Sequence, residues 1–230
     1  MKSDYRQGPA PVSTGAVRAH YDELACTYER KSNRACKRVY RWLIRRCLHG
    51  ADRVLELGAG AGCLLRASDA RFKVACDLSL PMLLAGRDEP HGARVVADAH
   101  QTPFGDARFD GAFCVNMLEH VANPDRAMAE VARMLVPGGR CLAVTPNGDI
   151  ERLLDILEKL HLKLPEGPHR FLTFEALART AGDAFDIVEH RRFAALPAGP
   201  RRLVHLIDRI VHRVYPGLGF MQYILLRKRG

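Results

Sequence analysis

At 230 residues, the chain is long enough to bury a sizeable core, and it fits one α/β domain with appended helices better than two independent domains. Hydrophobic residues make up 47% of it and charged residues 27%, which is ordinary for a globular protein and excludes a disordered chain. The N-terminus lacks the apolar region of a signal peptide and no apolar run reaches about 18 residues, so we expect a cytoplasmic protein without a membrane span.

The formal net charge of +9 is unevenly distributed along the chain. Residues 28–49 carry a net charge of +7 and residues 190–230 a net charge of +8, so the remainder is net acidic. Two basic blocks therefore flank an acidic middle, where we expect the chemistry to lie.

The seven cysteines form no CxxC pair, and several lie inside apolar segments, among them Cys76, Cys114 and Cys141. This distribution favours reduced thiols in the core over disulfides or a zinc site. We expect no metal.

Two helices are expected before the first strand. Tyr21 and Tyr28 are seven residues apart, so both project from one face of the first helix, where they can close a lid or simply pack. In the next helix, apolar residues at helical spacing predict an amphipathic cover on a sheet. These residues are Ala35, Val39, Trp42, Leu43 and Cys47.

Further along, short strand-like runs alternate with helix-like ones. The expected strands are 53–57, 73–77, 93–97, 109–116 and 140–145, and a helix that begins after Asn123-Pro124-Asp125 should stop at Pro137-Gly138-Gly139. Such alternation predicts right-handed βαβ units and a parallel sheet, the α/β doubly wound fold class.

The first strand runs into a loop with glycine at every second position, Gly58, Gly60 and Gly62. In a doubly wound sheet this loop lies at the carboxyl edge near the ligand-binding switch point. Cys63 stands where the last glycine of a dinucleotide fingerprint would fall, and no Gly-Lys-Ser/Thr follows as in a P-loop. The loop therefore predicts a ligand cradle without a pyrophosphate motif.

The segment ELGAGAG, starting at Glu56, resembles motif I of the class I S-adenosylmethionine (SAM) dependent methyltransferases, small-molecule type 11 group. The resemblance continues in order through ACDLSLPML, through VVADAHQTPFGDARFDGAFCVNMLEHV and through ARMLVPGGRCLAVTPN. It implies a Rossmann-like seven-stranded sheet, mostly parallel, with helices on both faces. The segment FMQYILLRKR resembles the family's last, antiparallel strand.

The resemblance also implies site residues for SAM. An acid at Asp77, followed by Leu78, would bind the ribose hydroxyls, and Asp98 with Ala99 would meet the adenine. The other cofactor contacts that it implies are Glu56, Gly58, Gly60, Gly62 and Asn116, together with Tyr21 and Tyr28 from a YDxxAxxY segment that folds over the cofactor.

The chemistry of the residues agrees with this assignment. Asp77 lies 21 residues after Glu56, close to the interval at which a Rossmann-like second strand presents a carboxylate to ribose. SAM carries a sulfonium and an ammonium but no phosphate, so an acidic site favours SAM over NAD. Alternatives stay open: the glycines as turn residues, Asp77 and Asp98 as helix caps, and Glu56 as a solvated or paired acid.

Methyl transfer needs a base only if the acceptor must lose a proton. The candidate bases are His120, just past the fourth strand, and His169 in an insertion after the fifth, each with a structural alternative. His91, His100 and His161 are expected on the surface.

The acceptor is predicted from what the motifs include and lack. NMLE, starting at Asn116, replaces the Asn/Asp-Pro-Pro-Tyr/Phe signature of enzymes that methylate planar amines or amides. VNMLEHV with HRFLTFEAL resembles enzymes of quinone and other small-molecule biosynthesis, which implies a hydroxylated or phenolic, lipophilic acceptor. The alternatives are an RNA or protein methyltransferase acting through the basic blocks, an NAD-type oxidoreductase and a degenerate binding partner; nucleic acid is disfavoured because no RNA-binding module precedes the fold.

The single domain divides into a helical lid and cover (1–50), a SAM-binding core (51–147) and an acceptor-side region with the last two strands (148–230). The last region contains a predicted basic amphipathic helix. Its apolar face packs on the protein or rests on an anionic membrane surface. The apolar residues of this helix are Leu203, Leu206, Ile207, Ile210, Val211 and Val214, and its arginines are Arg201, Arg202, Arg209 and Arg213.

The sequence leaves the oligomeric state open.

Overall fold

The computed structural model describes residues 12–31, 34–86, 92–151, 168–193 and 219–230. The predicted amphipathic helix over 201–214 and the histidines His91 and His161 lie outside these residues, so those expectations stay predictions. Within the described ranges, no helix has both the length and the apolar character needed to cross a membrane.

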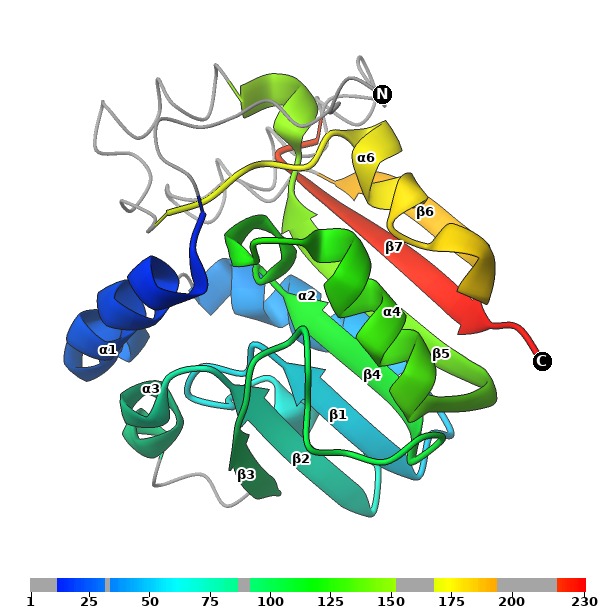
Figure 1. Ribbon diagram of the computed structural model, residues 1–230, viewed down its shortest axis with the longest axis horizontal. Coiled ribbons are helices and arrows are strands. Elements are labelled where there is room, and N and C mark those ends of the chain that lie inside the picture. The colour runs from blue at the N-terminus through cyan, green and yellow to red at the C-terminus, as the bar shows by residue number, and fades with distance from the viewer. Residues whose placement is uncertain (1–11, 32–33, 87–91, 152–167, 194–218) are drawn as a thin grey trace.

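A seven-stranded sheet organises the chain, in the order β3-β2-β1-β4-β5-β7-β6 (Figure 1). Neighbouring strands are parallel from β3 to β5, whereas β7 is antiparallel to both β5 and β6. The predicted Rossmann-like fold with an antiparallel last strand is confirmed. The strands are β1 (Arg53–Leu57), β2 (Phe72–Asp77), β3 (Ala93–Val96), β4 (Phe109–Val115), β5 (Leu135–Pro146), β6 (Phe185–Phe193) and β7 (Met221–Lys228).

Each face of the sheet carries its own hydrophobic core. Helices α4 (Pro124–Met134) and α6 (Phe174–Arg179) pack on one face, and α2 (Arg34–Cys47) and α3 (Leu80–Ala85) contribute to the core on the other. Figure 1 shows α4 across the near face and α2 behind the sheet. Successive residues of β4 alternate between the two cores, Phe113 on the α2 side and Cys114 on the α4 side, as a strand buried on both faces requires.

The end of α4 differs from the prediction. The helix ends at Met134, and residues 135–139, including Pro137-Gly138-Gly139, already belong to β5. The pairing register of β4 and β5 is irregular between Phe109 and Gly111: Phe109 pairs with Leu135 and Gly111 with Arg140, so β5 carries extra residues there, among them Gly138 with φ 78°. The helix therefore ends before the predicted stop, and the Pro-Gly-Gly segment belongs to a strand.

One residue predicted on the apolar face of α2 points away from the sheet. Trp42, expected on the apolar face, is 56% exposed and lies under the guanidinium of Arg46. The buried stripe instead includes Tyr40, Leu43, Ile44 and Cys47, spaced by three and four residues as one face of a helix requires.

The seven cysteines are all free thiols. Cys76, Cys114 and Cys141 are buried, as predicted. Burial raises the pKa of the Cys76 thiol and of the Cys141 thiol to about 12. Both are therefore inert core residues at neutral pH.

Helix α4 holds the loop between β3 and β4 through one carboxylate. Glu130 accepts hydrogen bonds from the backbone N–H of Thr102 at 2.8 Å, from its hydroxyl at 2.7 Å and from the guanidinium of Arg133. Arg133 in turn bonds the carbonyl of Phe104 and the carboxylate of Asp106. The loop that follows β3 is therefore fixed to a helix of the core.

We predict that Glu130→Gln lowers the free energy of unfolding at neutral pH by about 1 to 3 kcal/mol, because charge-assisted hydrogen bonds are lost. The Arg133 pairing lowers the pKa of Glu130 from 4.5 to about 2. The contribution of a carboxylate with a lowered pKa is complete above its ordinary pKa and is lost as the pH falls toward the folded-state value. Chemical denaturation should therefore show a difference that is constant above about pH 5 and shrinks from about pH 4 to pH 2.

The matched control is Glu23→Gln on the helix α1 (Thr14–Lys31), where the carboxylate is exposed and the same chemical change should alter stability little. A Glu130→Gln difference that persists unchanged to the acid end of the titration would contradict the assigned role.

Candidate active site

The glycine loop follows β1 at the carboxyl edge of the sheet. Gly58, Gly60 and Gly62 have φ values of 70°, 53° and 71°, a region that side chains disfavour. A Cβ at Gly58 would overlap the side chain of Met117, which follows β4. The loop after β1 and the turn after β4 are thus packed against each other at the switch point, where ligands of such sheets bind.

Asp77, at the end of β2, holds this loop in place. Its carboxylate accepts a hydrogen bond from the backbone N–H of Gly60 at 2.7 Å and from that of Ser79 at 2.8 Å. The N–H of Leu78 also stabilises the charged carboxylate. Ser79 is the N-cap of α3, and its hydroxyl donates to Asp22 of α1 at 2.5 Å. The sequence assigned no role to Asp22, although it follows Tyr21 directly.

Three acids therefore gather beside the glycine loop: Glu56, Asp77 and Asp22. Burial, with the neighbouring charge of Asp77, raises the pKa of Glu56 well above its usual value. Burial also raises the pKa of Asp77, with Asp22 adding to the effect and the backbone hydrogen bonds opposing it. A cation bound here would relieve this concentration of negative charge.

The side chains beside the glycine loop fit SAM, the ligand that this loop and Asp77 imply. Glu56 is 3% exposed, and its Oε2 atom has no hydrogen-bond partner among the described residues. A buried acceptor of this kind needs a donor, and the ammonium of SAM is one. The cradle thus combines carboxylate acceptors, close backbone approach and local negative charge, which suits a cationic ligand with ribose hydroxyls.

A second group of side chains lies one strand further out, after β3. Asp98 Oδ1 lies 2.6 Å from His100 Nδ1, and His100 Nε2 accepts from the backbone N–H of Asn123 at 3.1 Å. The surface position predicted for His100 is wrong, because its side chain is only 11% exposed. Ala99 packs against the core on the α4 side.

The structure joins Tyr21 and His120, which are distant in the sequence. Tyr21 Oη lies 3.0 Å from His120 Nε2, and His120 Nδ1 lies 2.9 Å from the carbonyl oxygen of Pro168. The ring of His169 is 6.2 Å from that of His120, edge to face, and contacts Phe171. Both candidate bases therefore lie in one cluster with the tyrosine of the predicted lid.

Two other predicted site residues are placed only in part. Asn116 directly follows β4 with φ 53°, a conformation that asparagine tolerates better than most residues, and the residue is exposed. Tyr28 lies on α1, and the structure does not describe its side chain. Their contacts with a cofactor stay predictions.

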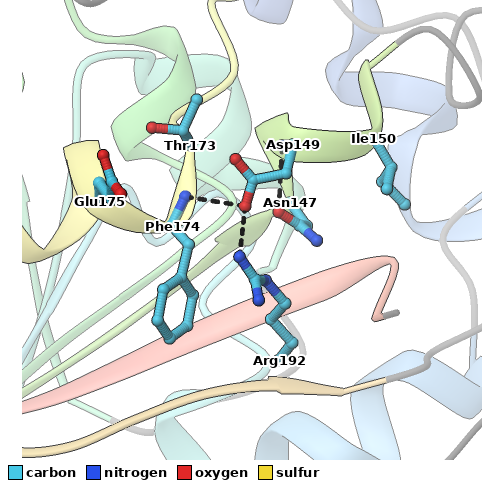
Figure 2. Close-up of a pocket in the computed structure, with 7 residues that line it drawn as sticks. All are labelled: Asn147, Asp149, Ile150, Thr173, Phe174, Glu175 and Arg192. Atoms are coloured by element: carbon cyan, nitrogen blue, oxygen red, sulfur yellow. Dashed lines mark hydrogen bonds and ion pairs between the residues drawn. The ribbon is translucent and has the colours of Figure 1, made fainter. Parts of the chain in front are cut away.

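A separate pocket of about 410 Å³ lies beyond the end of β5 (Figure 2). In it, Asp149 pairs with Arg192 of β6 at 2.5 Å and accepts from the backbone N–H of Phe174 at 3.3 Å. Arg192 also lies over the Phe174 ring. These contacts fasten the segment after β5 to β6 and α6, which is a structural role.

Comparison with known proteins shows which family the residues around this site resemble. Residues 55–143 match the model of a methyltransferase domain. Demethylmenaquinone methyltransferase of Clavibacter sepedonicus is 33% identical over 152 residues, which cover 61% of this chain and 60% of that protein. Residues 55–143 are thus a methyltransferase domain of the class I SAM-dependent type. This matched segment holds Glu56, the glycine loop, Asp77 and Asp98.

Other relatives match shorter parts. Demethylmenaquinone methyltransferase of Paenarthrobacter aurescens is 40% identical over 92 residues, which cover 39% of this chain and 36% of that protein. An uncharacterized protein of Methanocaldococcus jannaschii is 31% identical over 132 residues, which cover 57% of this chain and 52% of that protein. The chain thus spans less than two thirds of the length of these curated relatives.

Solved structures extend the likeness to nearly the whole fold. The [4+2]-cyclase SpnF superposes with a TM-score of 0.70 at 18% identity, covering 97% of this chain and 99% of that one. N-methyltransferase NodS from Bradyrhizobium japonicum, in complex with S-adenosyl-L-homocysteine, superposes with a TM-score of 0.65 at 13% identity, covering 94% of this chain and 100% of that one. At these identities the likeness shows the fold, and the reaction has to be inferred from the site.

We predict that Asp77→Asn weakens binding of S-adenosylhomocysteine by about 10- to 100-fold, or about 1.4 to 2.8 kcal/mol, because a charge-assisted acceptor is lost. Isothermal titration calorimetry measures the affinity, and circular dichroism checks that the variant is folded. Asp69→Asn, at an exposed aspartate, is the matched control and should bind normally. Unchanged affinity in a folded Asp77→Asn protein would leave Asp77 with a structural role alone.

Proposed function

We propose that this chain transfers the methyl group of SAM to a small, lipophilic acceptor through a phenolic or other hydroxyl group. The observation that carries the proposal is the hydrogen-bonded series from Tyr21 through His120 to the Pro168 carbonyl. A hydroxyl acceptor must lose a proton, and this series is arranged to take one.

The series fixes the tautomer of His120. A carbonyl oxygen can only accept, so Nδ1 of His120 carries the hydrogen and donates to Pro168. In the neutral ring Nε2 is then an acceptor, and the hydroxyl of Tyr21 donates to it. His120 is 6% exposed. Tyr21 is therefore the member of the pair that we propose contacts the acceptor, while His120 acts through it.

The position of the pair links it to the cofactor cradle. Tyr21 and Asp22 are consecutive on α1. Asp22 accepts from the hydroxyl of Ser79, whose backbone N–H bonds Asp77, the acid proposed to bind the ribose. Tyr21 contacts His120, which follows β4. The N–H of His120 bonds the carbonyl of Met117, whose side chain packs on Gly58. Helix α1 thus spans the two strand ends between which a methyl donor and an acceptor would meet.

The proton is accounted for in one step. SAM supplies a methyl group activated by its sulfonium, and the sulfur keeps the electron pair of the broken bond. As the acceptor oxygen bonds the methyl carbon, its proton passes to Tyr21 Oη, and the proton of Tyr21 passes to His120 Nε2. The imidazolium that forms keeps its Nδ1–H bond to Pro168 and later releases the proton to solvent.

The relatives support the lipophilic part of the proposal. Those named demethylmenaquinone methyltransferase suggest a quinone-like ring as the acceptor. Ionisation of a ring hydroxyl activates its oxygen and also the ring carbon beside it. Methylation at the oxygen needs only this proton transfer, whereas methylation at the carbon also requires that carbon to lose its hydrogen and the oxygen to regain a proton before the ring is restored. The membrane-surface reading of residues 201–214 accords with such an acceptor and stays a prediction.

We predict turnover of dihydroxynaphthalenes, with faster rates when an alkyl chain is attached, and little turnover of a primary amine of similar size. Production of S-adenosylhomocysteine is followed by mass spectrometry. Tyr21→Phe and His120→Ala should lower kcat by about 10²- to 10⁴-fold with the affinity for S-adenosylhomocysteine preserved.

His49→Ala, at an exposed histidine, is the control and should keep the wild-type rate. His169→Ala separates the two candidate bases, because it should lower kcat less than His120→Ala does. Rates within a few-fold of wild type in both Tyr21→Phe and His120→Ala would contradict the proton path. Preference for the amine would contradict the hydroxyl acceptor.

A further inference from the structure

We propose that His100 is a positioning residue that aims the carboxylate of Asp98 at the adenine amino group and so makes the site specific for adenine over other purines. The inference rests on the proposed use of SAM. It adds a role for a residue to which the sequence pattern gave none.

His100 lies between two parts of the chain that meet after β3 and after β4. Asp98 Oδ1 accepts from the backbone N–H of His100 at 2.9 Å and lies 2.6 Å from its Nδ1. On the other side of the ring, Nε2 lies 3.1 Å from the backbone nitrogen of Asn123. The ring therefore bridges Asp98 and the start of α4.

The bridge permits only one arrangement of hydrogens. A backbone N–H can only donate, so Nε2 of His100 must accept from Asn123. The neutral ring then carries its hydrogen on Nδ1 and donates it to Asp98. Two donors hold Oδ1, which restrains the plane of the carboxylate and with it the position of Oδ2.

The anchor of the bridge is rigid. Asn123 is the N-cap of α4, and its side chain accepts from the backbone N–H of Arg126 at 3.0 Å. Helix α4 is packed into the core through Ala127, Met128 and Val131. An imidazole fastened to a helix start orients its partner better than a solvated side chain does, because fewer rotamers remain available.

Asp98 is placed to meet a ligand beside Asp77. Its side chain is 37% exposed, whereas the His100 ring behind it is largely covered. The carbonyl of Asp77 accepts from the N–H of Ala97 at 3.0 Å, so Asp77, at the end of β2, and Asp98, just after the parallel neighbour β3, lie at the same edge of the sheet. With the ribose at Asp77, the remaining donor on that side of SAM is the adenine amino group, and a carboxylate can only accept.

The chemistry predicts discrimination between purines. Hypoxanthine has a carbonyl oxygen where adenine has the amino group, so a carboxylate fixed there faces an acceptor and loses its hydrogen bond. A site built to bond a donor rejects an analogue without one more strongly than a loose site does. Loss of His100 should therefore affect the adenine ligand and spare the hypoxanthine ligand.

The test compares the affinities of S-adenosylhomocysteine and S-inosylhomocysteine by calorimetry. Wild type should prefer the adenine ligand by about 10- to 100-fold. His100→Ala should reduce that preference to within about 3-fold, mainly through weaker adenine binding, with S-inosylhomocysteine affinity nearly unchanged. Asp98→Asn should also reduce the preference, and adding His100→Ala to it should change the preference no further.

Equal weakening of both ligands by His100→Ala would overturn the proposal, because it would show a general structural role. A full preference retained in His100→Ala would also overturn it. Binding of S-adenosylhomocysteine to wild type without preference would overturn the assignment of Asp98 to adenine. Failure of wild type to bind S-adenosylhomocysteine at all would instead contradict the proposed function.

Discussion

The carboxylate of Asp77 is the contact on which the cofactor side of the structure depends. It joins the glycine loop to the start of α3 through two backbone N–H groups, and Ser79 extends the connection to Asp22 of α1. Because β2 and β1 are parallel neighbours, the acid at the end of one strand reaches the loop that leaves the other. The glycine loop, the N-cap of α3 and helix α1 therefore share one polar centre.

This centre explains how a chain with a net positive charge presents an acidic site. Glu56 and Asp77 are held close together, and burial raises the pKa of each. Two such carboxylates favour a cationic ligand, because its charge offsets both the desolvation and their mutual repulsion. The segment after β4 completes the site: Met117 packs on Gly58, His120 contacts Tyr21 and Asn123 anchors His100.

The sequence predicted the parts of the structure that depend on local pattern. Apolar runs located β1 to β5 to within a few residues, apart from the start of β5, and the spacing from Glu56 to Asp77 fits the parallel pairing of β1 and β2. The pairing of Tyr21 with His120 was not predictable, because those residues are 99 positions apart and meet only in the folded chain. His100 was missed for the same reason, since its role depends on a backbone N–H of α4.

The central claim is that the acidic cradle is a SAM site, and thermal unfolding with added ligands tests it most directly. A ligand that binds only the folded chain stabilises it by about 2.7 kcal/mol at 100 times its Kd, which raises Tm by about 5 to 11 °C for a chain of this size. We expect such an increase with SAM and with S-adenosylhomocysteine, and none with NAD at the same concentration. An equal increase with NAD, or no increase with S-adenosylhomocysteine, would contradict the account.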